Sequence, residues 1–107
     1  MKILIKPLST NSLWKGRKYK TKEYDLYIRD MLYLLPNTLK IDPENIHFIF
    51  HLKKTTYDKA DLDNFLKPIL DIMKKKGIIK DDRYVKRIVA EKVISDEYKI
   101  EIVENGV

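Results

Sequence analysis

The chain has 107 residues, which is enough for one domain with a modest core and too few for two independent domains. It contains no cysteine, and this excludes disulfide bonds and thiolate metal sites. The 22 Lys and Arg residues against 16 Asp and Glu leave a formal net charge of +6, which favours polyanionic partners.

The chain begins MKILIKPL, a short apolar run that Lys6 and Pro7 interrupt. Such a run is too short for a membrane span or a secretory signal peptide, so the sequence predicts a cytoplasmic protein without a membrane partner. Repeats, low-complexity tracts and linkers are all missing from the sequence. We therefore expect a single domain over residues 1–107.

A strand and then a helix are predicted in the first third of the chain. Residues 2–8 are apolar and β-prone, and residues 9–20 are rich in turn-forming and basic residues, which is typical of a loop. Thr21 is a predicted N-cap, and Pro36 ends the helix because proline cannot continue it. Between them, large apolar residues recur at helical spacing: Tyr24, Tyr27, Ile28, Met31, Leu34 and Leu35.

The segment NIHFIFHLKK alternates as a half-buried strand does. His47 and His51 share its less apolar face. Residues four apart on a strand are separated by roughly 13 Å, which is too far for one metal ion. We therefore predict that the two histidines are ordinary strand residues. Four apolar residues face the predicted core: Ile46, Phe48, Phe50 and Leu52.

The C-terminal segments DRYVKRIVAEKVI and EYKIEIVE are two further predicted strands, joined by a tight turn at Ser95 and Asp96. Tyr98, Ile100 and Ile102 are predicted to face inward. With a second helix between residues 63 and 77, the element order is β-α-β-α-β-β. This order predicts an α+β fold in which two helices pack on a mostly antiparallel sheet of about four strands.

Pro68 places the start of the second helix. Its ring clashes with the carbonyl of Asn64 if Asn64 is already helical, so the helix is predicted to begin between Asp63 and Phe65, with Asp63 or Asn64 as its cap. The far end is marked by Lys74–Lys76, which suit the negative end of the helix dipole, and by Gly77, a natural C′ residue.

This start leaves Asp61 and Asp63 in an extended segment, where side chains two residues apart point to the same side. Both carboxylates can then meet one ion. Lys67 and Asp71 follow on the polar face of the helix, so that the helix buries one side and carries charged groups on the other.

A second pair, Asp81 and Asp82, follows Gly77, and the sequence allows but does not require it to join the first pair. Three or four close carboxylates repel one another unless a cation lies between them, and oxygen ligands of this kind suit Mg²⁺. Such an ion can activate water for phosphodiester hydrolysis, with Lys67 stabilising the phosphorane or positioning the scissile phosphate. The alternative interpretation is purely structural: DLDN is an N-cap and turn, Lys67 and Asp71 are an exposed ion pair, and KDD is a solvated turn. Spacing alone does not decide between this interpretation and a metal site.

Basic residues gather in two segments that precede the aspartates in sequence, and their phosphate contacts would give salt-dependent affinity for nucleic acid. Single clusters of this kind are more often a solvated surface. The candidate DNA-binding residues are Lys15, Arg17, Lys18, Lys20, Lys22, Lys53, Lys54 and Lys59, with Trp14, Tyr19 and Tyr57 as candidate stacking partners.

The stretch DLDNFLKPILDIMKKKGIIKDDRYV resembles the signature of the RusA family of Holliday-junction resolvases, small endodeoxyribonucleases common in phages and prophages. The match comprises an aspartate pair, a lysine four residues later, a further helical aspartate, a glycine and a double aspartate before a strand. A looser likeness at Asn11, Trp14 and Tyr19 extends it over nearly the full chain.

The resemblance implies that Asp61, Asp63 and Asp82 are catalytic, metal-binding carboxylates and that Lys67 is a catalytic lysine. Asp81 is implied as an additional ligand, and Asp71 has at most a supporting role. The implied cofactor is Mg²⁺, with Mn²⁺ as an alternative. The implied protein is a homodimer that binds four-way DNA junctions and resolves them by paired symmetric nicks.

Two alternatives remain open at this point. One is a binding module for branched DNA that does not cut, in which the aspartates only cap and solvate. The other is a nuclease of the same chemistry that acts on flaps or replication forks.

Overall fold

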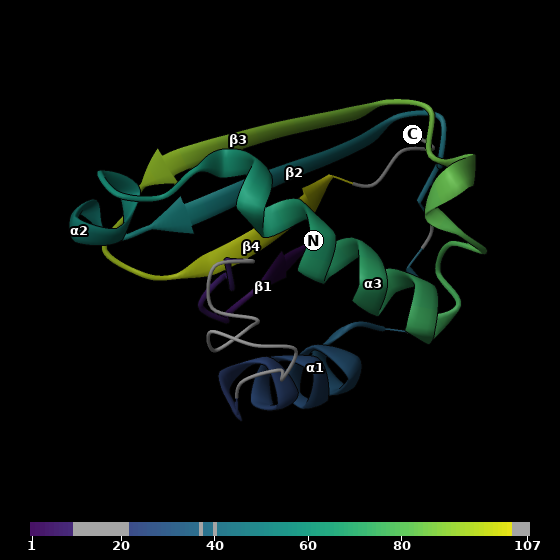
Figure 1. Cartoon of the computed structure of the whole chain (residues 1–107), viewed down its shortest axis with the longest axis horizontal. Coiled ribbons are helices and arrows are strands. Elements are labelled where there is room, and N and C mark those ends of the chain that lie inside the picture. The colour runs from purple at the N-terminus through teal and green to yellow at the C-terminus, as the bar shows by residue number, and fades with distance from the viewer. Residues whose placement is uncertain (10–21, 37, 40, 104–107) are drawn as a thin grey trace, which may run out of the picture.

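The structure is a computed structural model that describes residues 1–9, 22–36, 38, 39 and 41–103, with the backbone alone at Asp82. Its four strands form one sheet with the order β1-β4-β2-β3 (Figure 1). The strands are β1 Lys2–Ile3, β2 Ile46–Leu52, β3 Ile88–Ile94 and β4 Lys99–Val103. Pairs β1–β4 and β2–β4 are antiparallel and β2–β3 is parallel. The predicted α+β class and mostly antiparallel sheet are confirmed.

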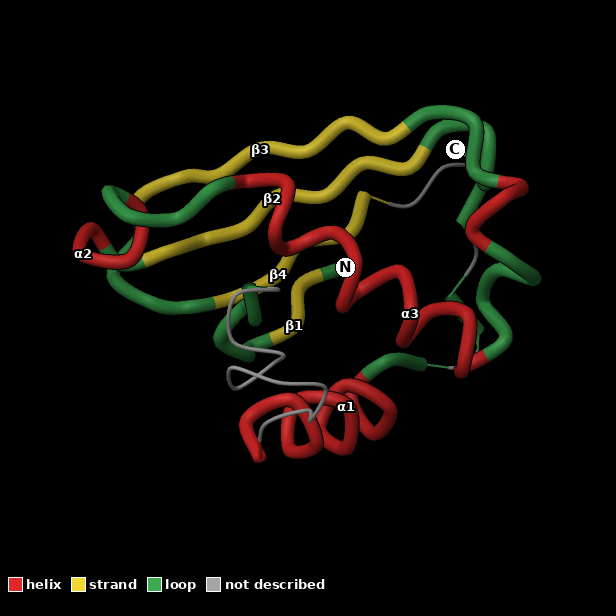
Figure 2. Tube along the Cα trace, viewed as in Figure 1, coloured by secondary structure: helices red, strands yellow, loops and turns green. Residues whose placement is uncertain are grey.

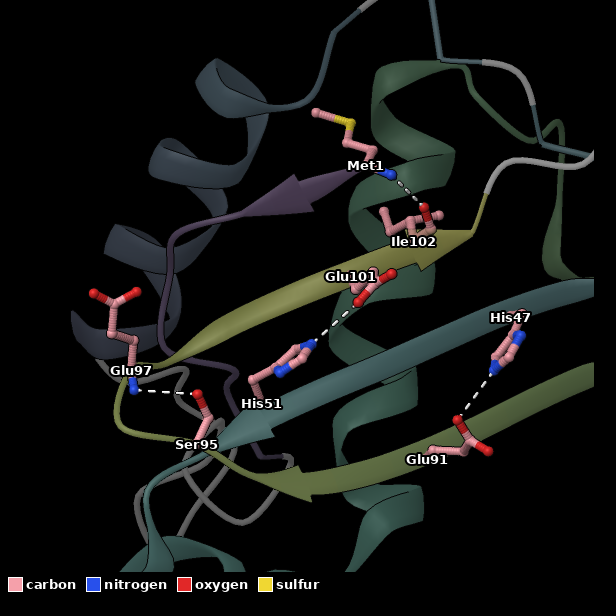
Figure 3. Close-up of polar contacts among 8 residues, drawn as sticks. All are labelled: Met1, His47, His51, Glu91, Ser95, Glu97, Glu101 and Ile102. Carbon is pink, nitrogen blue, oxygen red and sulfur yellow. Dashed lines mark hydrogen bonds and ion pairs between the residues drawn. The ribbon is translucent and has the colours of Figure 1, made fainter.

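Two long helices, α1 Lys22–Leu34 and α3 Leu66–Lys76, cover the same face of the sheet (Figures 1 and 3). A one-turn helix, α2 Lys54–Tyr57, follows β2, and two 3₁₀ turns, η2 Leu62–Phe65 and η3 Asp82–Tyr84, precede and follow α3. No element of the described ranges covers the opposite face. None of the helices in those ranges is long and apolar enough to cross a membrane.

The core lies between the helices and the sheet. The predicted inward face of β2 is fully buried, and Ile100 and Ile102 of β4 are buried beside it. From α3, Ile69, Ile72 and Met73 pack down onto this layer. The ring of Phe65 lies 5.1 Å from that of Phe50, so η2 is anchored directly to the centre of the sheet. The residues of β2 on this face are Ile46, Phe48, Phe50 and Leu52.

β3 and β4 follow one another closely, as predicted, but they do not pair with each other. β2 lies between them, parallel to β3 and antiparallel to β4. The connection crosses the end of β2, where the backbone N–H of Ser95 donates to the carbonyl of Leu52 at 2.8 Å. The expectation of a simple tight turn between adjacent strands is therefore wrong, because a four-residue connection is long enough to step over one strand.

The first strand is shorter than predicted. β1 ends at Ile3, where the N–H of Ile5 donates back to the Ile3 carbonyl at 2.9 Å, and Pro7 has no N–H with which to continue a ladder. The first helix matches its prediction over Lys22–Leu34. Its predicted N-cap, Thr21, and nearly all of the predicted loop lie outside the described residues.

Candidate metal and nucleic-acid site

The first aspartate pair lies where the chain turns from an extended segment into a helical one. Asp61 is extended, with φ −85° and ψ 121°, and Asp63 is already inside η2. The expectation that both lie in extended chain is therefore wrong. The N–H of Asn64 donates to the carbonyl of Asp61 at 3.1 Å, which closes the 3₁₀ turn before Pro68.

The helix cap also differs from the prediction. α3 begins at Leu66 with Phe65 at the N-cap position, and no side-chain hydrogen bond caps it, so neither Asp63 nor Asn64 serves as the cap of α3. The burial of Phe65 fixes this start, because its ring must reach Phe50. Pro68 is then the third residue of α3, inside the first turn as predicted, where a missing N–H has little cost.

Carboxylates and an amine face solvent at this end of α3. The side chains of Asp61 and Asp63 are exposed. One turn further along, Lys67 Nζ lies 3.1 Å from Asp71 Oδ1, with side-chain exposures of 57% and 25%. Asp61, Asp63 and Lys67 therefore belong to one short solvent-facing stretch, as predicted, while Ile69, Ile72 and Met73 are buried.

Lys92 of β3 holds the backbone that leads into this stretch. Its Nζ donates to the backbone carbonyls of Tyr57 at 2.8 Å and Ala60 at 3.0 Å, and it lies 4.3 Å from the centre of the Tyr57 ring. These contacts fix the chain immediately before Asp61. The sequence analysis missed Lys92, because its position beside the buried Phe50 is visible only in the strand register of the fold.

An open groove of about 640 Å³ adjoins Asp61. It runs from the α2–η2 segment towards α1 and β1. The described residues around it mix apolar, hydroxyl and charged side chains, among them Lys6, Tyr27, Asp30, Thr56, Lys59 and Asp61. The hydroxyl of Tyr27 is buried in this region, and burial is the main reason that its pKa is raised, with the backbone of Leu8 acting in the opposite direction.

The second aspartate pair lies away from the first pair. η3 follows α3 and leads into the start of β3, whereas η2 precedes α3 and contacts β3 from the helix side (Figures 1 and 2). α3 alone has 11 residues, which corresponds to a length of roughly 16 Å. Within one chain the two aspartate segments therefore lie at opposite ends of α3.

Asp81 is partly buried and already has partners. The N–H of Arg83 donates to its Oδ1 at 3.3 Å, and Arg83 Nε lies 3.9 Å from its Oδ2. The side chain of Asp82 lies outside the described part of the structure. In the described side chains, no three Asp, Glu, His or Cys residues are close enough to hold a metal ion. The donors at Asp61 and Asp63 are thus of the right chemical kind for Mg²⁺, but the described part of one chain does not supply enough of them.

The two histidines of β2 lie on the helix-free face, where each meets a glutamate (Figure 3). His47 Nε2 lies 3.4 Å from Glu91 of β3, and His51 Nε2 lies 3.2 Å from Glu101 of β4. The hydrogen bond with His51 is the main reason that the pKa of Glu101 is lowered. The histidines project from opposite ends of β2, in keeping with their predicted role as strand residues.

The candidate DNA contacts divide into two groups. Lys22 is exposed at the start of α1, and Lys53, Lys54 and Lys59 are exposed around α2, beside the first aspartate pair. Lys54 Nζ is 2.9 Å from Asp58, and Lys53 Nζ lies 5.3 Å from the Tyr98 ring centre. The remaining candidates lie outside the described residues: Lys15, Arg17, Lys18 and Lys20, together with Asn11, Trp14 and Tyr19.

Comparison with protein families supplies the deciding observation. The model of the family described as endodeoxyribonuclease RusA matches residues 9–103, which is most of the chain. The chain belongs to the RusA endodeoxyribonuclease family. No curated protein sequence matches this one. Membership confirms the resemblance found in the motif and implies Holliday-junction resolvase endonuclease activity.

Proposed function

We propose that the protein is a Mg²⁺-dependent endonuclease that resolves four-way DNA junctions as a homodimer. The family match over residues 9–103 carries this proposal. In the proposed site, Asp61 and Asp63 of one copy and Asp81 and Asp82 of the other hold the cation, and Lys67 acts on the scissile phosphate. Mn²⁺ is an alternative cation with the same ligand preferences.

The position of the two aspartate segments supports a site shared between copies. A cation site needs ligands within about 2–2.6 Å of the ion, and segments at opposite ends of α3 cannot provide this in one chain. In a dimer with a suitable two-fold axis, the aspartate segment before α3 of one copy lies beside the aspartate segment after α3 of the other copy. Two such sites then form in each dimer.

The residues of the chain have distinct roles in this site. The carboxylates bind and orient the cation, which supplies Lewis-acid activation of water and of the phosphodiester. Lys67 places a positive charge one helical turn from Asp63, where it offsets negative charge that develops on the phosphoryl oxygens. Asp71 holds Lys67 in that direction through their 3.1 Å contact. Lys92 fixes the backbone before Asp61 and is a positioning residue.

The basic residues beside the site would bind DNA phosphates without reading sequence. Lys53, Lys54 and Lys59 surround α2, so a strand that crosses η2 would meet them. A dimer with two-fold symmetry has two such surfaces, and this symmetry fits a substrate with two equivalent scissile strands. The paired-nick mechanism is proposed on this ground.

Mixing two inactive variants tests the shared site. In the proposed dimer, Asp63→Asn and Asp82→Asn each damage both sites, but a mixed dimer keeps one site with both aspartates intact. An equal mixture that re-equilibrates should therefore regain about a quarter of the parent's intact sites. A mixture of Asp61→Asn with Asp63→Asn is the matched control and should stay inactive. Recovery in neither mixture, with both variants folded and dimeric, would contradict the shared site.

Cation binding provides a readout that does not depend on cleavage. Calorimetric titration with Mg²⁺ should show binding by the parent that weakens at protein concentrations where the dimer dissociates. Asp63→Asn and Asp82→Asn should each abolish it, and both should still bind a four-way junction. Binding that is unchanged in either variant would contradict its assignment as a ligand.

Substrate choice is tested with three DNA molecules of equal length: a mobile four-way junction, a flap and a linear duplex. We expect cleavage of the junction in strong preference to the other two. Equal cleavage of the flap would favour the fork or flap nuclease. No cleavage of any substrate at any Mg²⁺ or Mn²⁺ concentration would leave only a binding module.

A further inference from the structure

We propose that the groove beside Asp61 binds one unpaired nucleotide of the DNA substrate, with the base inside the groove and its phosphate at the mouth of the groove. The inference rests on the proposed function, because that function brings the DNA backbone to Asp61. It adds a site for a base beside the scissile phosphate. Base contacts select a cutting position in a way that phosphate contacts do not.

The groove has the size of a ligand site. Its volume of about 640 Å³ falls within the roughly 300–1,000 Å³ that pockets for small ligands occupy. It lies between the segment that follows β1, the first turns of α1 and the α2–η2 segment. A base stacked in a duplex cannot enter such a groove, whereas a base rotated out of its stack can. This rotation costs least at a branch point, where stacking is already interrupted.

The walls of the groove combine apolar surface with hydrogen-bonding groups, as the faces and the edge of a base require. Leu26 of α1 is 48% exposed although it is a large apolar residue, and the partly buried Leu8 borders the same space. Thr55 of α2 and Asp30 of α1 bring a hydroxyl and a carboxylate to the groove. A base that enters therefore covers apolar surface that water otherwise contacts, and it meets polar groups at its edge.

The Tyr27 hydroxyl supplies a more specific signal. Tyr27 borders the groove, and its hydroxyl is buried without a hydrogen-bond partner in the described part of the structure. The backbone of Leu8 is close enough to affect its pKa, but no hydrogen bond of normal geometry joins them. A buried hydroxyl without a partner is unfavourable, so it favours a ligand that brings a donor or an acceptor. Side chains often shift on binding, and such a shift opens this hydroxyl to the edge of a base.

Two lysines meet at the mouth of the groove. Lys6 Nζ lies 5.1 Å and Lys53 Nζ lies 5.3 Å from the centre of the Tyr98 ring, and both lysines are exposed. The Tyr98 hydroxyl is 2.6 Å from Thr56 Oγ1, and Lys6 and Thr56 themselves border the groove. Two positive charges that gather around one ring repel each other, and a phosphate beside them offsets this repulsion. The phosphate of a nucleotide whose base lies in the groove fits this position.

A second, smaller hollow of about 370 Å³ fits a nucleotide less well. It is bordered by exposed Leu4 and Tyr33, and its arginine, Arg29, already lies 3.2 Å from Asp30. It does not border Asp61. This hollow offers a base apolar contact, but it offers the attached phosphate only a cation that is already engaged.

The base contact is tested by measuring DNA binding without divalent cations, so that the result does not depend on cleavage. Immobile four-way junctions carry, at each nucleotide next to the branch point in turn, either a mismatched base or no base. Both changes leave the position unpaired. At one position the parent should bind the mismatched junction at least about fivefold more tightly than the abasic junction, because only the first supplies a base. Equal affinities at every position would overturn the inference.

Filling the groove provides a matched pair of variants. Leu26→Trp places an indole in the groove from an exposed position, and it should remove the preference for the mismatched junction. Leu34→Trp is the same change on the same helix, at a residue that is 39% exposed and does not border this groove, and it should keep the preference. A preference that survives Leu26→Trp would overturn the inference.

Tyr27→Phe removes only the hydroxyl. It should not lower the urea midpoint of unfolding, because the hydroxyl has no partner in the described structure to lose. It should weaken binding of the mismatched junction about threefold or more and leave binding of the abasic junction unchanged. A lower midpoint with an unchanged preference would show that the hydroxyl serves the fold, and its place in the groove would be overturned.

The phosphate contact has its own signature. Lys6→Gln should weaken binding of both junctions alike and reduce the slope of log affinity against log salt concentration by about one. Lys2→Gln is the control, because Lys2 pairs in register with Glu101 and acts on its charge from the helix-free side of the sheet. It should leave the slope unchanged. An unchanged slope for Lys6→Gln would overturn the phosphate contact.

These measurements separate the two proposals. A protein that cuts junctions with Mg²⁺ but binds mismatched and abasic junctions equally keeps the proposed function and overturns the base site. A protein that shows the base preference but cuts no substrate keeps the base site and overturns the nuclease. A protein that neither binds nor cuts junctions overturns both.

Discussion

At the scale of single residues, the buried side chains around η2 and α3 decide which charged groups face solvent. Asp61, Asp63 and Lys67 do lie in one exposed stretch, because the burial of Phe65 and Ile69 forces the other side of the chain outward. The 3₁₀ turn at η2 was not predictable from the sequence. Pro68 excludes only some helix starts, and among the others the packing of the Phe65 ring decides where α3 begins. Lys92 was missed because its role depends on carbonyls 32 and 35 residues away in the chain.

Replacing Lys92 by Met removes two charge-assisted hydrogen bonds but keeps most of the packing of the side chain. We expect the free energy of unfolding to fall by about 2 kcal/mol, because the partly buried carbonyls of Tyr57 and Ala60 lose their donor. Mg²⁺ affinity should fall as well, since the backbone before Asp61 loses its support. Urea denaturation and calorimetry measure the two effects. Lys75→Met, on the exposed end of α3, is the control, and an equal loss there would contradict the argument.

Glu101 predicts a pH dependence of stability. The hydrogen bond with His51, and secondarily the charges of Lys2 and the N-terminus, lower the pKa of Glu101 in the folded state. This contribution to stability is fully present above the unfolded pKa of about 4.3 and is lost as the pH falls through the lower folded value.

Glu101→Gln should therefore be less stable than the parent at pH 7, and the difference should shrink towards zero as the pH falls below about 4. Urea denaturation of both proteins across this range measures the difference. Glu44→Gln removes an exposed pair with Lys86 and should leave stability nearly unchanged over the same pH range. A difference for Glu101→Gln that persists unchanged in acid would contradict the charge effect.

At the scale of elements, periodicity predicted what local sequence controls. The alternation of β2 and the end of α3 at Gly77 are both found, because burial and backbone conformation act within a few residues. The partners of β3 and β4 were not predictable. Whether two strands in succession pair directly or enclose a third depends on which surfaces fill the core, and the connecting residues fit both arrangements.

Gly77 provides a clean test of one such local signal. It has φ 80° at the C-cap of α3, and apart from its neighbours along the chain nothing lies within 4 Å of the position that a Cβ would occupy. Gly77→Ala should therefore destabilise through the backbone alone, by roughly 1–2 kcal/mol. Gly77→Asn should cost less, because asparagine adopts this conformation more readily. Equal stability of all three proteins in urea denaturation would contradict the assigned strain.

At the scale of the whole molecule, the sequence did not reveal how its two aspartate segments are arranged. It places one pair before α3 and the other after it, and only the fold shows that the chain after this helix does not return to the first pair. A family signature is a pattern along one chain, so it cannot distinguish a site within a chain from a site shared between two copies. That distinction determines what a dimer with one intact site can do.

Such a dimer forms when Asp63→Asn and Asp82→Asn are mixed, and it should nick a junction without resolving it. On a cruciform plasmid, paired cuts within one binding event give linear DNA, whereas a single cut releases the torsional strain that maintains the cruciform and gives nicked circles. We expect mainly linear product from the parent and nicked circles from the mixture, with equal binding of a synthetic junction by both. A mixture that gives the parent's share of linear DNA would show that one site cuts both strands, and the two-fold arrangement would then have no role in resolution.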